Sequence, residues 1–535
     1  MSLPLTKIPL SDIPQFSKRD LAYIREEAEL KEFYKYPVEV GQFENVIADK
    51  AKDQTNREIL VQVLKEQYHP LSENEKVNNN IKSLAQNNCY TVITAHQPTI
   101  FTGPLYYIYK ILSTIKLAEE LSKQYPAQQF VPVFVSGAED HDFEEVQQTL
   151  IFGKSITWEN EEKGSVGKMS TKSLSSILEQ LVALIGDKNE ASKMVAIIKK
   201  AYQGNATYGS ATVELVHELF KKFGLVVLDM SAADLKRAAI PLFKKELLSS
   251  PSVGLVEETQ QRLNEKGYKA QAMARDINLF YVGDQYRERI VRDGGIFKVL
   301  NTQTEFSETE MIAELETHPE RFSPNVIMRP LYQELILPNL AYIGGGGEIA
   351  YWLERKTQFK HFGINFPMLI RRCSALIVTA ADRKKINKLS LNTSDLFTDP
   401  HQLIKQFLHD NADSNLNLTK EKEAVSELFQ GILAKAKAID VTLEGAVKAE
   451  ESKQLKSLQQ MEGRFMKAEK RNQELKVSQI NKLQDKLFPG NSLQERKVNF
   501  LSFYGNFGAT FFEEMKEGLN PLEKMFVVFE EGNGM

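Results

Sequence analysis

Short apolar runs alternate with longer segments of helical spacing in the middle of the chain. The runs at 90–94, 130–137 and 224–229 are nearly continuous in apolar residues, which predicts strands buried on both faces of a sheet. Between the first two, residues 104–124 carry apolar side chains at the spacing of one helix face. Strand, helix and strand in this order indicate an α/β core, in which helices cover both faces of a parallel sheet.

Changes in composition around this core suggest how the chain is divided. Residues 1–88 are polar with helical spacing and are expected to pack on a core that spans 89–395. Two stretches within the core, about 150–220 and 265–325, interrupt the alternation, so we interpret them as insertions. The second contains Asp293-Gly294-Gly295, which predicts a hairpin turn because glycine accepts positive φ.

A further change in composition marks residues 396–490. Lysine, glutamate, glutamine and leucine dominate there, and glycine and proline are scarce, which predicts a long antiparallel helical hairpin. Asn472 lies in the predicted seam, where a polar residue sets the register of a coiled coil. Residues 491–535 are expected to return to the core, and the apolar run at 525–529 to complete its sheet. The other seam positions are Leu458, Met461, Phe465, Ala468 and Leu475.

The composition argues against several classes of protein. At 535 residues with 42% hydrophobic residues, the chain is long enough for two or three domains with large cores. Its net charge of −4 and the lack of a basic stripe argue against nucleic acid as a partner. No run approaches the roughly 18 apolar residues that cross a bilayer, and Cys89 and Cys373 lack the spacing of a zinc site. We therefore expect a cytoplasmic protein with no membrane partner and no structural metal.

The loop after the first predicted strand has the features of an anion site. Gly103 relaxes the backbone, and Pro104 suits the first turn of the helix that follows. A strand that leads into such a turn directs unpaired backbone N–H groups at one point, which suits a phosphate or a carboxylate. An ordinary connection between strand and helix explains the same pattern equally well. His96 and Gln97 lie at the mouth of this strand, where they are candidates for binding a substrate.

The second predicted strand is followed by an acidic segment. Residues 139–145 hold five carboxylates and one imidazole, and they follow a strand at the edge where open α/β sheets bind ligands. A carboxylate beside His141 holds the ring in one tautomer, as general acid–base chemistry requires. The same cluster suits an amine or, through its oxygens, a divalent cation. It also fits a plain acidic helix N-terminus, which the helix dipole favours.

A third group of residues combines an arginine with a run of glycines. The four glycines at 344–347 lie between a predicted strand and a helix expected at 348–362, and they permit close approach of a ligand to the backbone. Glu348 suits an ammonium group, and Arg329 suits a carboxylate held by two hydrogen bonds. The glycines lack the spacing of a Rossmann or P-loop fingerprint, so a flexible turn is the alternative.

Five motifs between about residues 90 and 500 are His96-Gln97-x5-Gly103-Pro104-Leu105-Tyr106-x2-Tyr109-Lys110, Gly137-x-Glu139-Asp140-His141-Asp142-Phe143-x-Glu145, Arg329-Pro330, Gly344-Gly345-x-Gly347-Glu348-x-Ala350-Tyr351-Trp352 and Leu493-Gln494-Glu495-Arg496. In this combination they resemble the bacillithiol biosynthesis cysteine-adding enzymes. The resemblance implies a Rossmann-like core similar to that of class I aminoacyl-tRNA synthetases, with connective insertions and a projecting antiparallel coiled coil. It also implies a ligase that joins L-cysteine to the amino group of glucosaminyl-malate, giving bacillithiol. We expect a homodimer.

The resemblance implies roles for individual residues. Amide formation from a free carboxylate is uphill in water, so an activating donor is expected, and ATP with Mg²⁺ is the candidate. Asp140, His141 and Asp142 are the expected catalytic residues, with His141 or Asp142 taking the proton of the attacking amine. The expected substrate-binding residues are His96, Gln97, Glu139, Arg329, Glu348 and Tyr351. The expected nucleotide-binding residues are Thr102, Gly103, Pro104, Lys110, Gly344, Gly345 and Gly347.

Two other functions are compatible with the same sequence. An adenylate-forming enzyme or a nucleotidyltransferase that acts on another small acid would use a similar core. A scaffold protein would use the coiled coil and keep only a vestigial pocket. Thiol profiling of a strain that lacks the protein separates these functions, because only the ligase predicts missing bacillithiol together with accumulated glucosaminyl-malate.

Overall fold

The computed structural model describes residues 4–186, 190–412 and 416–531. The chain forms two compact units, one of Met1–Ile377 with Leu493–Asn533 and one of Val378–Ser492. Within the described residues, no helix is both long enough and apolar enough to cross a membrane.

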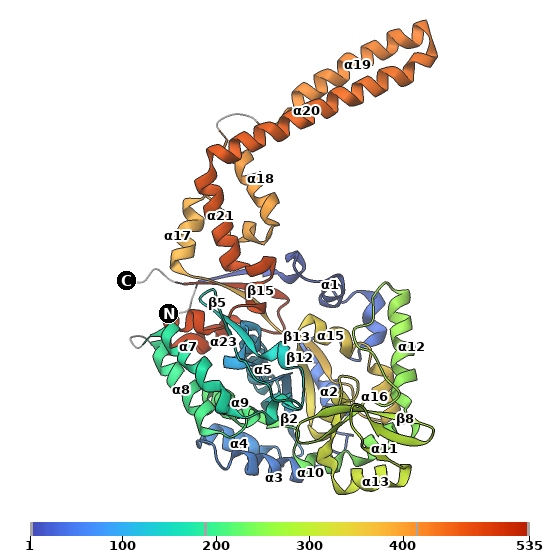
Figure 1. The fold of residues 1–535 in the computed structure, drawn as a ribbon, viewed down its shortest axis with the longest axis vertical. Helices are drawn as coiled ribbons and strands as arrows, with labels where there is room; N and C mark the ends of the chain where they lie inside the picture. The colour runs from blue at the N-terminus through green and yellow to red at the C-terminus, as the bar shows by residue number, and fades with distance from the viewer. Residues whose placement is uncertain (1–3, 187–189, 413–415, 532–535) are drawn as a thin grey trace. The chain divides into compact units, whose positions relative to one another are not determined.

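The first unit is built on a parallel five-stranded sheet (Figure 1). Its strand order is β13-β12-β2-β3-β6, and every neighbouring pair runs parallel. Three of these strands are the apolar runs expected from the sequence, and nearly all of their residues are buried. The predicted Rossmann-like parallel sheet is therefore confirmed. The strands are β2 (Cys89–His96), β3 (Gln129–Ser136), β6 (Val226–Asp229), β12 (Asn339–Gly344) and β13 (Met368–Arg371).

The strands of this sheet end level with one another at one edge. His96 pairs with Ser136, Ser136 with Asp229, and Gly344 with Arg371. Because parallel strands all point the same way, the loops that follow the five strands gather at this edge. The edge therefore collects the segments in which the sequence placed its candidate chemistry.

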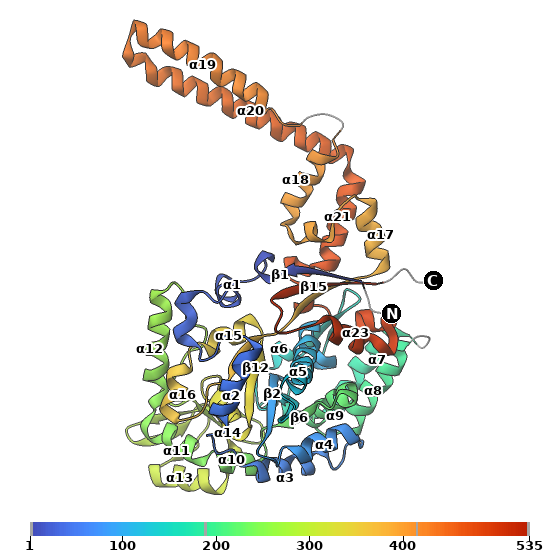
Figure 2. The ribbon, with the colours of Figure 1, turned by 180° about the vertical axis from the view of Figure 1, so that it is seen from behind.

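Helices cover the sheet, and α5 (Leu105–Gln124) lies along it in both ribbon views (Figures 1 and 2). Pro104 is the residue before α5 rather than its first residue. The other helices of the first unit are α1 (Lys18–Ile24), α2 (Phe43–Lys50), α3 (Arg57–Tyr68), α4 (Glu75–Ser83), α6 (Phe143–Val146), α7 (Ser175–Ile185), α8 (Glu190–Gly204), α9 (Tyr208–Phe220), α10 (Ala233–Ala238), α11 (Ile240–Ser249), α12 (Pro251–Glu265), α13 (Glu308–Thr317), α14 (Arg329–Ile336), α15 (Gly346–Trp352), α16 (Lys356–Phe362), α22 (Leu501–Phe507) and α23 (Phe511–Gly518).

The single helix expected at 348–362 is instead two helices, α15 and α16. Glu354 lies in the break and is fully buried. Its carboxylate accepts hydrogen bonds from the backbone N–H of Gln271 at 2.7 Å and from the side chain of Gln260 at 2.9 Å. These contacts with a distant segment hold the interruption, which a local helical pattern cannot anticipate.

The segment at 265–325 forms an antiparallel sheet of order β10-β9-β8-β7-β11. The predicted hairpin turn is confirmed, since Asp293 pairs with Ile296 across Gly294 and Gly295, both of which have positive φ. The strands are β7 (Leu279–Val282), β8 (Arg287–Asp293), β9 (Ile296–Val299), β10 (Glu305–Phe306) and β11 (Phe322–Pro324). A small separate hairpin joins β4 (Gln148–Ile151) to β5 (Lys154–Thr157).

The C-terminal strand does not complete the parallel sheet, so that prediction is wrong. Instead β15 (Met525–Glu530) lies between β1 (Leu5–Pro9) and β14 (Ser374–Val378) in a separate three-stranded sheet. An apolar run specifies a buried strand, whereas the identity of its neighbour depends on tertiary pairing. The return of the chain is anchored at Gln494, whose side chain bonds both the N–H and the C=O of Ile377 at 2.9 and 3.0 Å.

The second unit is helical, and its pair α19 and α20 forms the long antiparallel hairpin predicted from composition. The predicted seam is wrong at Asn472 and Leu475. Helix α20 ends at Asn472, whose side chain bonds Glu469 of its own helix, and Leu475 is 82% exposed. The break at Gln473, which also bonds the backbone of Asn411, interrupts the repeat. The helices are α17 (Ala380–Lys388), α18 (Pro400–Asp410), α19 (Thr419–Ile439), α20 (Glu444–Asn472) and α21 (Glu474–Leu487).

Candidate active site

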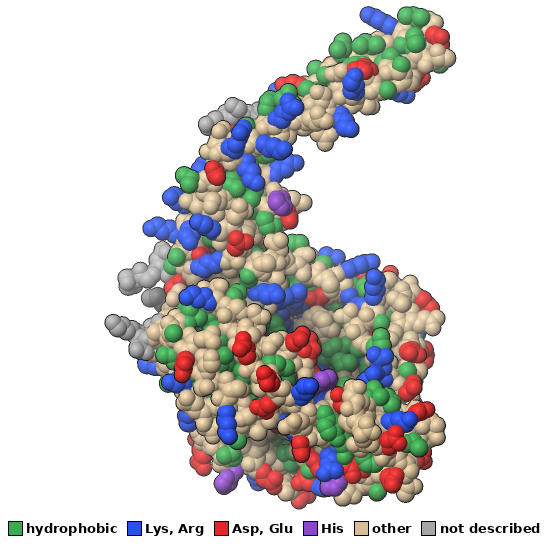
Figure 3. All heavy atoms as spheres, in the orientation of Figure 1, with side chains coloured by type: hydrophobic (Ala, Val, Ile, Leu, Met, Phe, Trp, Pro, Cys, Tyr) green, Lys and Arg blue, Asp and Glu red, His purple; other side chains and the backbone are tan. Residues whose placement is uncertain are grey.

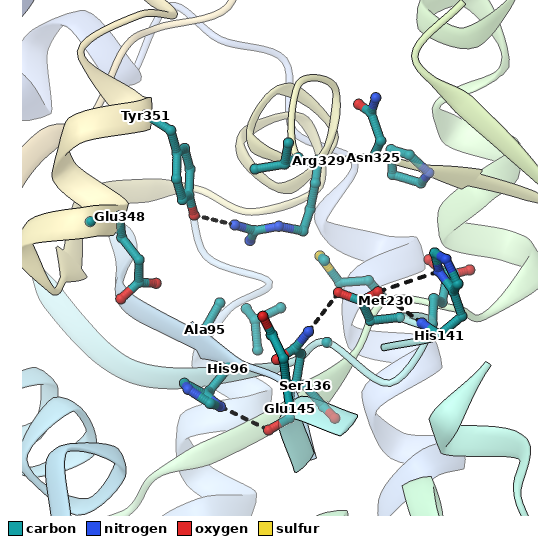
Figure 4. A pocket seen from close by; sticks show the side chains of 18 of the residues that line it. Ala95, His96, Ser136, His141, Glu145, Met230, Asn325, Arg329, Glu348 and Tyr351 are labelled. Carbon is teal, nitrogen blue, oxygen red and sulfur yellow. Dashed lines mark hydrogen bonds and ion pairs between the residues drawn. The ribbon is translucent and has the colours of Figure 1, made fainter. Parts of the chain in front are cut away.

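A cavity of about 940 Å³ lies at the carboxyl edge of the parallel sheet. Loops after each of its five strands contribute side chains (Figure 4), and others come from α5, α14, the antiparallel sheet and the C-terminal segment. Figure 3 shows charged side chains of both signs around the hollow on this face. The polar lining includes His96, Gln97, Tyr106, Glu139, Asp140, His141, Glu145, Asp229, Arg275, Arg287, Arg289, Asn325, Arg329, Glu348, Tyr351, Arg372 and Arg496.

Asp140 occupies the centre of the acidic segment. Its carboxylate accepts hydrogen bonds from the side chain of Gln97 at 2.7 Å and from the backbone N–H of His141 at 2.8 Å. The Arg287 guanidinium lies 3.6 Å from the same carboxylate. Burial by itself raises the pKa of Asp140, but Arg287 and these hydrogen bonds outweigh it and leave the pKa below its ordinary value. Asp140 is therefore an ionised acceptor that organises its neighbours rather than a base.

The other two expected catalytic residues differ in position. His141 lines the cavity, and its Nδ1 lies 2.9 Å from Nη1 of Arg287. A guanidinium has no lone pair to offer, so Nδ1 accepts this hydrogen bond and is not free to take a proton from a substrate. Asp142 is exposed, precedes α6 and is not among the lining residues. The structure thus places neither expected proton acceptor in a position to act as one.

Glu139 lines the cavity but already has a cation. The Nζ of Lys236, from α10, is fully buried and lies 2.8 Å from both carboxylate oxygens of Glu139. The same ammonium donates to the backbone carbonyl of Phe322 at 2.9 Å. Glu139 therefore ties the loop after β3 to α10 and to the antiparallel sheet.

Glu348 binds an ammonium group, as its residue type suggested, but this group is the side chain of Lys110 and not part of a substrate. The Lys110 Nζ is buried and lies 2.8 Å from Glu348. The hydroxyl of Tyr342 and the backbone N–H of Gly345 donate to the same carboxylate at 2.5 and 2.9 Å. Burial alone would raise the pKa of Glu348, but these partners lower it to about 2. Lys110 is not among the lining residues, so its predicted contact with a nucleotide is not supported.

The loop before α5 is not the anion cradle that its sequence suggested. Three of its backbone N–H groups are already bonded: that of Phe101 to the Tyr202 hydroxyl, that of Thr102 to the carbonyl of Thr99 and that of Gly103 to the carbonyl of Ile100. Gly103 has a φ of 62°, and a Cβ there would lie 2.6 Å from the Thr99 methyl group. The chain closes on itself, and Thr102, Gly103 and Pro104 do not line the cavity.

The glycine run after β12 contributes part of itself to the cavity. Gly345, Gly346 and Gly347 line it, whereas Gly344 ends the strand and does not. Gly346 faces the carboxylate of Asp20, which a Cβ would contact too closely. This close approach requires glycine, and Asp20 is itself paired with Arg371 at 3.2 Å.

Arg329 and Tyr351 lie in the cavity as expected and contact each other. The Arg329 guanidinium donates to the Tyr351 hydroxyl at 2.5 Å, and the two side chains point toward one another in Figure 4. The Nη1 of Arg329 donates to the side-chain oxygen of Gln333 at 3.2 Å. Arg329 is therefore held in place before any ligand binds.

His96 also lies in the cavity. Its Nδ1 is 2.9 Å from the backbone carbonyl of Gln97, and its Nε2 is 3.0 Å from the Tyr106 hydroxyl. Burial and the nearby Lys110 ammonium lower the pKa of His96 to about 4. The ring is therefore neutral at physiological pH.

Arginine is the feature that the sequence analysis missed. Six arginines line the cavity, and of these only Arg329 was expected as a site residue, although Arg496 lies in one of the family motifs. The guanidinium of Arg372 already donates a hydrogen bond to the carboxylate of Glu495 at 2.8 Å. The guanidinium groups of Arg275, Arg289 and Arg496 make no hydrogen bond or ion pair with any described side chain, so they are available to an anionic ligand. The alternation of Arg287 and Arg289 on one strand was the available signal, because positions two apart share a face.

The described part of the chain holds no group of three or more His, Cys, Asp or Glu side chains arranged to bind a metal ion. Glu145 lines the cavity, and partial desolvation and the Asp142 carboxylate raise the pKa of Glu145 above its ordinary value. This carboxylate is thus the strongest base among the acidic side chains of the loop after β3 for which a shift is resolved.

Two family models match this chain. "Bacillithiol biosynthesis BshC, N-terminal Rossmann-like domain" matches residues 3–373, and "Bacillithiol biosynthesis BshC, C-terminal coiled-coil domain" matches residues 375–531. A crystal structure described as a "putative arginyl t-RNA synthetase" from Campylobacter jejuni covers 80% of this chain and 100% of its own, at 11% identity and a TM-score of 0.21. That score is too low to establish a shared fold.

Relatives of known family extend the match to the whole length. A protein of Flavobacterium johnsoniae named "Putative cysteine ligase BshC" is 43% identical over 96% of this chain and 97% of its own. A protein of the same name from Christiangramia forsetii is 40% identical over 99% of this chain and 100% of its own. With both domains matched in order, the chain belongs to the BshC family of bacillithiol biosynthesis.

Proposed function

We propose that this chain is a ligase that joins L-cysteine to the amino group of glucosaminyl-malate in the cavity at the carboxyl edge of the parallel sheet. The observation that carries the proposal is the set of three unpaired arginines, Arg275, Arg289 and Arg496, around a carboxylate-rich loop. Malate and cysteine both present carboxylates, which guanidinium groups bind through paired hydrogen bonds. The carboxylates of the loop suit the amine that must be oriented and deprotonated.

Glu145 is assigned the role of proton acceptor. An amine attacks only after it has lost its proton, and a base with a raised pKa is better matched to this task. Glu145 lines the cavity and has such a pKa. It takes the place of His141 and Asp142, because Arg287 occupies the Nδ1 of His141 and Asp142 lies outside the cavity lining.

ATP with Mg²⁺ remains the proposed activating donor. Of the nucleotide-binding residues expected from sequence, Gly345 and Gly347 line the cavity. With the unpaired Arg496 they form the group that would contact phosphates. The donor supplies a good leaving group on the cysteine carboxyl, and the residues of this chain then orient the amine toward it.

Mass spectrometry of the purified protein with L-cysteine and glucosaminyl-malate tests the proposal. Bacillithiol is expected with ATP and Mg²⁺, together with one AMP for each amide formed if the activated species is an adenylate. Release of ADP instead would identify an acyl phosphate. If no condition yields bacillithiol, the assigned substrates are wrong, and turnover of another small acid would favour an adenylate-forming enzyme of different specificity.

Arg289→Met is expected to raise the KM for glucosaminyl-malate about 10-fold or more, because it removes a charge-assisted hydrogen bond to a carboxylate. The substitution should change kcat less, since the contact is present in both ground and transition states. Arg292→Met is the matched control, because Arg292 lies on the same strand but bonds Glu308 and the backbone of Leu248. Equal KM values for the two variants would show that Arg289 does not bind glucosaminyl-malate.

A further inference from the structure

The two histidines of the cavity have partners of opposite kind at the same ring nitrogen, Nδ1. At His141, the Nη1 of Arg287 is 2.9 Å from Nδ1, and Nε2 has no described partner. At His96, Nδ1 is 2.9 Å from the carbonyl oxygen of Gln97. A carbonyl only accepts and a guanidinium only donates, so the proton of neutral His96 lies on Nδ1 and that of neutral His141 lies on Nε2.

Arg287 is rigidly placed to impose this difference. It is 7% exposed and extends from β8. Its Nε donates to the Ser323 hydroxyl at 3.0 Å, and its Nη2 donates to the carbonyl of Pro324 at 3.3 Å. The guanidinium lies 3.9 Å from the centre of the Phe280 ring. Contacts from β11 and β7 therefore fix its orientation before His141 is considered.

We propose that Arg287 is a positioning residue that holds His141 as the Nε2–H tautomer, so that His141 presents a hydrogen-bond donor to the cavity. Because His141 lines the cavity and its Nε2 has no described partner, that proton is available to a ligand. His96 has the opposite arrangement, since its Nε2 accepts a hydrogen bond from the Tyr106 hydroxyl.

The consequence for catalysis rests on the proposed function. When the amine attacks the activated cysteine carboxyl, a C–N bond forms and the electron pair of the C=O bond moves to oxygen. The Nε2–H of His141 donates a hydrogen bond to that oxyanion and keeps its proton. Collapse of the intermediate restores C=O and breaks the bond to the leaving group, while the amine proton passes to Glu145.

Imidazole ¹⁵N NMR of the full-length protein, labelled at its 8 histidines, tests the tautomer directly. A His141→Gln variant assigns the signals. The wild type is expected to show an unprotonated Nδ1 and a protonated Nε2 at His141, and the reverse at His96. In Arg287→Met, His141 should lose the preference while His96 keeps it. Arg289→Met is the matched control, because it removes an equal charge two residues along the same strand without a contact to His141.

These spectra need no turnover, so their outcome is independent of the assigned substrates. A proton on Nδ1 of His141 in the wild type overturns the proposal without any variant. An unchanged His141 tautomer in folded Arg287→Met overturns the role of Arg287.

Kinetics test the part that rests on the ligase reaction. Arg287→Met and His141→Gln are each expected to lower kcat about 100-fold, with smaller changes in KM, because a single oxyanion donor is lost. The double variant should be no slower than His141→Gln, since both changes remove one interaction. Additive losses would show that Arg287 acts through something other than His141.

Discussion

Lys110→Met is expected to lower the free energy of unfolding by about 3–5 kcal/mol, because it leaves the Glu348 carboxylate partly buried without its cation. The value should fall toward the lower end, since the Glu348 side chain keeps 25% of its surface exposed. Urea titration monitored by circular dichroism measures the loss. Adding Glu348→Gln should recover much of the stability, because it removes the uncompensated charge.

Lys116→Met is the matched control for this substitution. Lys116 lies on the same helix, but its partner Glu517 is 65% exposed, so we expect a loss of at most about 1 kcal/mol. Equal losses in the two variants would mean that the pair of Lys110 and Glu348 contributes no more than a surface ion pair.

The contribution of Glu348 to the free energy of unfolding should also depend on pH. Its pKa is about 2 in the folded protein, against an ordinary value of 4.5. A depressed folded pKa means that the stabilisation is complete above about pH 5 and is lost as the pH falls from about 4.5 toward 2. The difference in stability between the wild type and Glu348→Gln, measured across this range, should shrink accordingly.

Asp140→Ala is expected to lower kcat/KM at least about 100-fold for the proposed ligase reaction, because it releases several groups that must be placed together. Asp140 holds Gln97 and the backbone of His141, and it faces Arg287. Steady-state rates of bacillithiol formation measure the effect. The melting temperature should fall only modestly, because the Asp140 side chain is 39% exposed, although Arg287, which it faces, is buried.

Asp142→Asn tests whether the sequence pattern or the structure identifies the functional aspartate. The sequence predicts a catalytic role for both Asp140 and Asp142, whereas of these two the structure places only Asp140 in the cavity lining. We therefore expect Asp142→Asn to keep its activity within about 2-fold. A loss as large as that of Asp140→Ala would contradict the geometry described for this loop.

Local patterns in the sequence determined the elements of the core. Strands buried on both faces need apolar side chains at every position, and β2, β3 and β6 each show such a run. The direction of these strands also follows, because a helix between two strands makes them parallel. From this alone, the loops after β2, β3 and β12 could be expected at one edge, which is where His96, Asp140 and Glu348 lie.

What a side chain contacts was decided only by the tertiary structure. The sequence showed that Glu348 suits an ammonium group, but not that Lys110, 238 positions earlier, supplies it. The same holds for Arg287, which reaches His141 from another sheet. The loop before α5 was likewise predicted to bind an anion, yet its N–H groups at Phe101, Thr102 and Gly103 donate to Tyr202 and to carbonyls of the loop itself. The period of a pattern sets the local backbone, whereas partners distant in sequence are chosen by how the elements pack.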